Sequence, residues 1–243
     1  CCTRAEAYGA LLHASVFSHK EIRLSTENAA VARRLQALLQ RAFFVVCEPQ
    51  RVGRKLQLAV TGTEAVGRIF DALGYDRKSH ITYHLNRNVL EEDCCIASFL
   101  RGAFLMAGTV AGPDKKSHLE LKTARQSLAG EETSLLLDLG LSPKQMRRAS
   151  AHILYFKDGT SVEDFLTRIG APRAAMELME AKVEKNIRNT INRQVNCETA
   201  NLVKAADASA RQIAAIRAVL DAHGEEGFPE NLRETVRLRL EYP

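Results

Sequence analysis

The sequence has 243 residues, of which 46% are hydrophobic and 26% are charged, a composition typical of a folded chain with one large domain or two smaller ones. The most apolar stretch, residues 97–111, is too short for a membrane helix and contains Arg101, and no secretory signal is recognisable, so the sequence predicts a cytoplasmic protein with no membrane partner. The net charge of +5 is compatible with an anionic partner but is too small to establish one.

The start of the chain recurs near its middle. Residues 1–15 align without a gap to residues 94–108, so that Cys1, Cys2, Gly9, Ala10, Leu12 and Ala14 recur as Cys94, Cys95, Gly102, Ala103, Leu105 and Ala107. Identities that include a double cysteine indicate an internal duplication.

Both copies have the same predicted elements in the same order, at an interval of about 93 to 97 residues. A first helix precedes a hairpin, an amphipathic helix, a second hairpin and a short final helix. In the first copy the hairpin lies at 16–26, the amphipathic helix at 27–40, the second hairpin at 43–60 (strands 43–47 and 55–60) and the final helix at 63–73. The matching elements of the second copy lie at 109–123, 124–139, about 146–157 and 161–169. The pattern predicts an α+β fold with two αββαββα units, halves 1–75 and 94–171 of one domain, related by a pseudo-two-fold axis. Gly9 and Gly102 would allow close packing of the first helices.

The six cysteines do not follow the spacing of a zinc site. Two pairs are vicinal, Cys1-Cys2 and Cys94-Cys95, and no two cysteines are separated by two residues. We therefore expect small, buried, reduced side chains, and we predict no metal and no cofactor.

The duplicated helices carry the motifs Ala7-Tyr8-Gly9-Ala10-Leu11-Leu12-His13-Ala14-Ser15 and Leu100-Arg101-Gly102-Ala103-Phe104-Leu105-Met106-Ala107-Gly108. This arrangement resembles the LAGLIDADG homing endonuclease fold, in which each motif helix ends in an acid that binds a divalent metal. Ala14 and Ala107 stand at those acid positions, and a methyl group offers no oxygen ligand. The resemblance thus implies a nuclease scaffold without catalytic residues. The alternative is a residual metal-dependent nuclease that takes ligands from elsewhere, such as Asp114 or Glu120.

The C-terminal third has a helical pattern and a basic character. Residues 172–193 are predicted as a connecting helix, and 200–222 as a second amphipathic helix with Leu202 buried; a third begins at Pro229. Between the first two, residues 192–202 are rich in Asn, which suits either a cap at an interdomain junction or a phosphate-contacting surface. The candidates for DNA contact are Lys185, Arg188, Asn189, Asn192, Arg193, Asn196, Lys204 and Arg211.

The doubled cysteine segments, the run Asn196-Cys197-Glu198-Thr199-Ala200-Asn201, and Pro229 onward are similar to the WhiA family of bacterial regulators. The resemblance covers nearly the whole chain. It implies a helix-turn-helix domain that binds double-stranded DNA, in transcriptional control of sporulation, cell division and chromosome segregation at the nucleoid.

In that family the chain continues past the point matching Pro243 into the recognition helix. Residues 194–243 are therefore expected to be the start of a truncated helix-turn-helix domain, with weak, salt-sensitive DNA binding. Basic residues of the repeat-domain hairpins are a further, open possibility for DNA contact. A protein-docking scaffold for other regulators or RNA polymerase is the alternative function.

Overall fold

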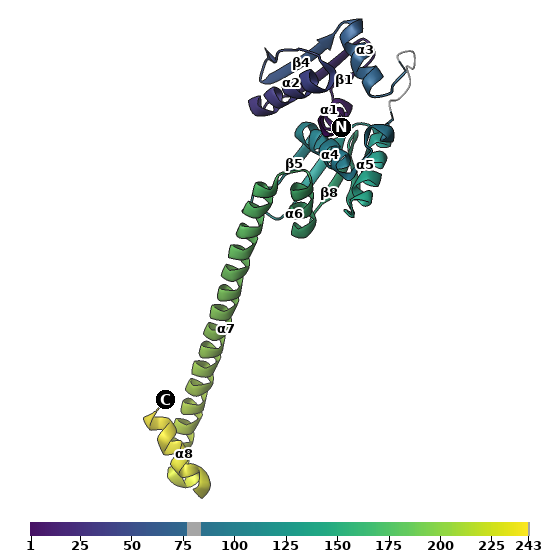
Figure 1. The fold of residues 1–243 in the computed structure, drawn as a ribbon. Helices are drawn as coiled ribbons and strands as arrows, with labels where there is room; N and C mark the ends of the chain where they lie inside the picture. Colours follow the sequence, from purple (N-terminus) through teal and green to yellow (C-terminus); the bar gives the residue numbers. More distant parts are fainter. Residues whose placement is uncertain (77–83, 243) are drawn as a thin grey trace. The chain divides into compact units, whose positions relative to one another are not determined.

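The computed structural model describes residues 1–76 and 84–242, and it divides into two compact units, Cys1–Lys182 and Val183–Pro243 (Figure 1). The first unit contains two four-stranded antiparallel sheets with their helices, and the second is helical. Within the described residues, no helix is both long enough and apolar enough to cross a membrane.

The first half of the repeat is built around one sheet with strand order β1-β2-β4-β3. The alternation of Ile22 and Leu24 with polar residues turns both apolar side chains inward on β2, where they are buried on the side that α2 covers. The elements of this half are α1 (Cys2–Leu12), β1 (Val16–Phe17), β2 (Glu21–Thr26), α2 (Ala29–Phe43), β3 (Gln50–Val52), β4 (Lys55–Thr61) and α3 (Thr63–Ala72).

The second half repeats this topology with strand order β5-β6-β8-β7. Leu119 and Leu121 are buried on β6 as Ile22 and Leu24 are on β2. A short 3-10 helix η1 (Arg87–Val89) precedes α4 (Asp93–Ala107), β5 (Gly108–Val110), β6 (Leu119–Thr123), α5 (Gln126–Asp138), β7 (Lys144–Arg148), β8 (Ala151–Phe156) and α6 (Gly159–Arg168). The predicted αββαββα repeat is confirmed.

One predicted strand of the first half is wrong. Residues 43–47 do not pair with β4. The strand that forms the second hairpin with β4 is β3, which is joined to it by the Gly53 turn. Phe43 instead ends α2, and Phe44 adopts a left-handed conformation with φ 56° that caps the helix. Val45 is buried all the same, so the apolar pattern marks burial of this segment rather than pairing in a sheet.

The two first helices, α1 and α4, pack side by side at the centre of the first unit (Figure 1). A methyl group on Gly9 would lie 1.9 Å from the carbonyl oxygen of Phe99, and one on Gly102 would lie 1.9 Å from that of Glu6. These contacts are reciprocal, because Glu6 and Phe99 occupy matching positions in the two copies. Only glycine allows backbones to approach this closely.

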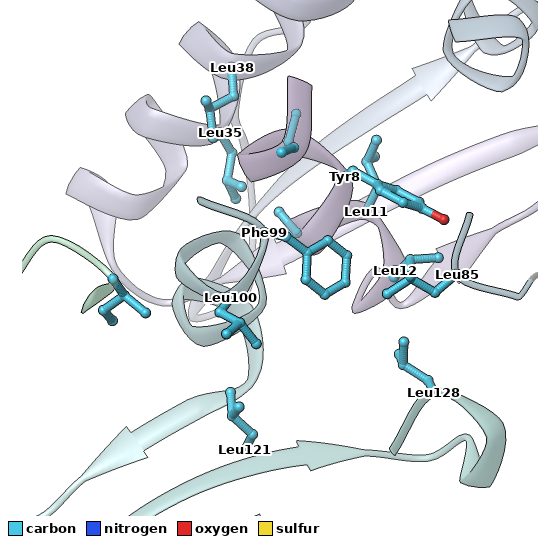
Figure 2. Packing of buried hydrophobic residues seen from close by; sticks show 14 of the residues in the cluster. Tyr8, Leu11, Leu12, Leu35, Leu38, Leu85, Phe99, Leu100, Leu121 and Leu128 are labelled. Atoms are coloured by element: carbon cyan, nitrogen blue, oxygen red, sulfur yellow. The ribbon is translucent and has the colours of Figure 1, made fainter. Parts of the chain in front are cut away.

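The core around these helices is continuous between the two halves. Figure 2 shows Tyr8, Leu11 and Leu12 of α1 close to Phe99 of α4, with Leu128 of α5 beyond them. The rings of Tyr8 and Phe99 meet edge to face, with centroids 5.4 Å apart. The Tyr8 hydroxyl also accepts a hydrogen bond from the Asn86 backbone at 2.7 Å, which fastens the segment before η1.

A buried carboxylate ties α1 to its neighbours. Glu6 accepts hydrogen bonds from Arg34 of α2, Nε at 2.8 Å and Nη2 at 2.7 Å, and from Arg101 of α4 at 3.2 Å. Arg101 also donates to the carbonyl of Ile169. The position matching Glu6 in the second copy is Phe99, so this polar network breaks the symmetry of the repeat.

The C-terminal part contains one long helix where two were predicted. The structure runs α7 from Pro172 to His223, followed by η2 (Glu225–Gly227) and α8 (Glu230–Glu241). The predicted end of the connecting helix at residue 193, and the capping interpretation of the Asn-rich stretch, are therefore wrong. Without Pro or Gly to break it, the helix continues, and its Asn side chains are exposed instead of competing for backbone hydrogen bonds. Leu202, predicted to be buried, is 71% exposed.

Candidate nucleic-acid interface

A pocket of about 580 Å³ lies where α1 and α4 end. Residues 12–15 and 106–109 form one side, and residues 122–125 and 148–151 form the other. Ala14 and Ala107 both line it, so the two positions at which the sequence lacks acids come together in one cavity. The C-terminal ends of α1 and α4 thus face one shared pocket rather than two separate surfaces.

The pocket wall carries positive charge. Lys122, Arg125 and Arg148 line it, and none of the described lining residues is Asp or Glu. The side chain of Arg125 is half-buried and makes no ion pair with any described residue; burial lowers the pKa of its guanidinium. Hard divalent cations need several oxygen ligands, so the residues present do not fit the metal that this fold implies.

The carboxylates near the pocket are engaged with other groups. Oε1 of Glu132, on α5, is hydrogen-bonded to Nε2 of His13 at 2.7 Å, and the two side chains are only 1% and 3% exposed. The other carboxylate oxygen of Glu132 has no partner among the described residues. Glu120 lies 2.7 Å from His118 and 3.5 Å from Arg148, and neither Glu120 nor Asp114 lines the pocket.

The cations of the pocket come from the second half of the repeat. Lys122 lies near the end of β6, Arg125 immediately precedes α5, and Arg148 is the last residue of β7. The repeat alignment places Ser25 and Asn28 at the first-half positions that match Lys122 and Arg125. The positive charge is therefore an addition to one copy and not a property of the duplicated unit.

The hairpins carry basic residues on their strands and turns, and two of these residues, Lys122 and Arg148, also line the pocket. Arg23 is half-buried and bonded to Glu21, with Nε to Oε1 at 2.9 Å. The other hairpin cations are exposed: Lys20, Arg51, Arg54, Lys55, Lys115, Lys116, Lys122, Arg147 and Arg148.

The predicted DNA-contact residues of the second unit all lie on α7 and are all exposed. Lys185, Asn189, Asn192 and Asn196 follow one another at steps of three or four, which places them on one stripe of the helix. Arg188 and Arg193 flank this stripe, and Lys204 and Arg211 lie further along α7. At its C-terminal end α7 packs on α8, where Val236 is buried and Arg239 donates to Gln212 at 2.9 Å.

Comparisons with known proteins agree with this architecture. The family model described as the WhiA LAGLIDADG-like domain matches residues 96–188, and that of the WhiA C-terminal HTH domain matches residues 191–243. A "Probable cell division protein WhiA" from Ruminiclostridium cellulolyticum is 35% identical over 253 residues, which cover the whole of this chain and 81% of that protein. The chain belongs to the WhiA family. A second WhiA, from Alkaliphilus metalliredigens, is 36% identical over 259 residues, with the same coverage. These relatives are named as cell division proteins and not as enzymes.

Solved structures show the same fold at low identity. Full-length WhiA from Thermotoga maritima matches 98% of this chain and 81% of its own, with a TM-score of 0.62 and 24% identity. The homing endonuclease I-DmoI, solved in complex with DNA and Mn, matches 69% of this chain and 96% of its own, with a TM-score of 0.50 and 13% identity. WhiA thus shares the LAGLIDADG fold.

Two features of this WhiA chain were missed in the sequence. The cations of the pocket lie on separate turns and strand ends, and no linear pattern brings them together. The cysteines were expected to be buried, yet Cys1, Cys94 and Cys197 are exposed, and only Cys47 and Cys95 are buried. The repeat alignment itself held the missing signal, because two vicinal pairs at equivalent helix starts must meet if the helices pair.

Proposed function

We propose that this WhiA-family chain is a DNA-binding regulator of cell division that cuts no DNA. The observation that carries the proposal is the pocket at the ends of α1 and α4, where alanines occupy both acid positions and cations line the wall. Phosphodiester hydrolysis by this fold depends on carboxylates that hold a metal, and the pocket provides none among its described lining residues.

The same pocket is suited to a phosphate group of the DNA backbone. A guanidinium binds phosphate through two parallel hydrogen bonds, and Arg125 forms no ion pair with any carboxylate among the described residues. Lys122 and Arg148 lie on the same wall and would add charge. In this proposal a site that once bound metal and DNA keeps only the contact to the DNA.

The α7 surface would supply the second contact. Lys185, Arg188, Asn189, Asn192, Arg193, Asn196, Lys204 and Arg211 are exposed, and most lie within the part of the chain that matches the HTH model. Lysine and arginine there would contact phosphates, and asparagine can also pair with base edges. Control of transcription, with roles in sporulation and chromosome segregation at the nucleoid, is part of the proposal by resemblance to the family.

The binding proposal is tested by fluorescence anisotropy of labelled double-stranded DNA, titrated with the chain at several salt concentrations. We expect Arg125→Ala to weaken binding several-fold and to reduce the slope of log K against log salt by about one, because one phosphate contact is lost. Arg68→Ala is the matched control: it removes the same charge from α3, which covers the inner face of the sheet, and should leave the affinity unchanged.

Two results would overturn the proposal. Absence of binding even at low salt would refute DNA binding by this chain. Equal affinity of Arg125→Ala and the parent would refute the phosphate contact in the pocket.

A further inference from the structure

Four cysteine thiols gather at the opposite ends of the same central helices. The Sγ atoms of Cys1, Cys2, Cys94 and Cys95 all lie within 4.8 Å of one another, and those of Cys2 and Cys94 are 3.4 Å apart. Among the described residues this is the one cluster of three or more His, Cys, Asp or Glu side chains placed to hold a metal ion. The remaining cysteines, Cys47 and Cys197, lie outside it.

The duplication builds this cluster. Each copy has a vicinal pair of cysteines at the start of its first helix. The close contact at Gly9 and Gly102 holds the two helices in register. Equivalent residues therefore meet at the pseudo-two-fold axis, with two thiols from each half. Zinc motifs ordinarily draw both ligands of a pair from one short loop, which is why the spacing along the chain does not reveal this arrangement.

The spacing of the thiols suits a single tetrahedral ion. Four sulfurs bound to zinc at about 2.3 Å lie roughly 3.8 Å from one another, a separation that small side-chain rotations can reach from the observed cluster. Tetrahedral sulfur ligation selects zinc over hard cations such as Mg²⁺. The free backbone N–H groups of the two helix N-termini also favour thiolates over thiols.

The surroundings of the cluster allow an ion to enter. Cys95 is buried and Cys2 half-buried, whereas Cys1 and Cys94 are exposed, so the cluster is anchored on one side and open to solvent on the other. Ser98, one turn after Cys94, donates to the Cys94 carbonyl at 2.7 Å and holds the start of α4 in shape.

We propose that Cys1, Cys2, Cys94 and Cys95 bind one Zn²⁺ ion that fastens the two halves of the repeat together. Each thiol bound as thiolate releases its proton to solvent, and no oxidation or reduction takes place. The ion ties α1 to α4 at the ends that lie away from the pocket, and its role is structural, since four protein sulfurs leave no open position for a substrate. The site is independent of DNA binding.

The first test is metal analysis of the untagged chain, purified under reducing conditions. We expect about one zinc ion per chain. Replacement of zinc by Co²⁺ should give the intense thiolate charge-transfer absorption of a tetrahedral cobalt site.

Variants decide which residues hold the ion. Cys94→Ser, at an exposed position, should abolish zinc binding while leaving the circular dichroism spectrum native. Cys2→Ser should do the same. Cys197→Ser, also exposed but outside the cluster, is the matched control and should retain one zinc ion. Removal of zinc from the parent by a chelator should lower its melting temperature, and Cys94→Ser should show the lowered value without chelator.

Three outcomes would overturn the proposal. The first is a metal-free chain that fails to take up zinc while all of its thiols are reduced. The second is a Cys94→Ser variant that keeps the stoichiometric ion. The third is iron with inorganic sulfide in place of zinc, which would assign the thiols to a cluster of another kind.

Discussion

Substitution of Gly9 by Ala should separate the two central helices. The added methyl would lie 1.9 Å from the Phe99 carbonyl oxygen, 2.8 Å from its carbon and 2.9 Å from the Ala103 nitrogen. All three atoms belong to the backbone of α4, so no side-chain rotation relieves the overlap. The helices must move apart by about 1 Å, which in a close-packed core forfeits a quarter to a half of the dispersion energy at the contacts.

The magnitude follows from two opposing contributions. Alanine gains about 1 kcal/mol of helix propensity over glycine in a helix interior. Overpacking of a core ordinarily costs about 1–3 kcal/mol, and a backbone clash lies at or beyond the upper end of this range. Around Gly9 the fully buried Tyr8 and Phe99 would lose their contact as the helices separate. We expect a net loss of about 2–3 kcal/mol in the free energy of unfolding.

The assay is urea unfolding followed by tyrosine fluorescence, because the chain has five Tyr and no Trp. Gly130→Ala is the matched control: this glycine lies inside α5 and a methyl group there would meet no atom within 4 Å. It should gain about 0.5–1 kcal/mol. A Gly9→Ala chain that is as stable as Gly130→Ala would refute the close contact of α1 and α4.

Three further predictions concern single side chains. His13→Ala leaves the buried Glu132 carboxylate without its hydrogen bond and should cost about 3–5 kcal/mol in urea unfolding; a loss below about 1 kcal/mol would contradict this. The Asp158 carboxylate caps α6 by accepting a hydrogen bond from Ser161 N at 2.7 Å, and this bond lowers the pKa of the carboxyl. The stabilisation by this cap is therefore present above the unfolded pKa of about 3.9 and is lost as the pH falls through the folded pKa. Asp158→Asn keeps a cap that does not titrate, so its melting temperature should fall less than that of the parent between pH 6 and pH 3; parallel curves would argue against the carboxylate. Arg193→Ala on α7 should weaken DNA binding and reduce the salt slope by about one, and unchanged anisotropy titrations would remove this residue from the interface.

The repeat could be predicted from the sequence because its signals are local and occur twice. The alternation at Ile22 and Leu24 recurs at Leu119 and Leu121, and the glycine that permits close helix packing recurs at the matching position. Two independent copies of a weak pattern give a strong prediction. The order of the strands in each sheet was not predicted, because the pairing of β2 with β4 and of β6 with β8 joins strands from different hairpins.

The errors arose where a local pattern had two physical explanations. Phe43, Val45 and Cys47 are buried in alternation with exposed neighbours, as in a strand. The left-handed Phe44 nevertheless ends a helix there, and the strand begins only at Gln50. The Asn-rich stretch had the composition of a cap, yet asparagine on an exposed helix face costs little, and α7 continues through it.

The remaining features depend on distant parts of the chain coming together. The Arg125 and Arg148 side chains share a pocket only because the β7–β8 turn folds back beside the end of β6. The thiols of Cys2 and Cys94 meet only because two helices pair in register. Residue spacing along the chain does not reveal the first pairing, whereas the repeat alignment indicates the second once the two first helices are taken to pair.

The most direct test of the central claim, a LAGLIDADG scaffold that binds DNA without cutting it, is a plasmid nicking assay. It should be run at protein concentrations and salt conditions where anisotropy shows that the DNA is bound, with Mg²⁺ or Mn²⁺ added. We predict that supercoiled DNA remains intact, because Ala14 and Ala107 supply no oxygen ligand to a metal at the helix ends. Metal-dependent nicking by the parent that Arg125→Ala abolishes would contradict the account.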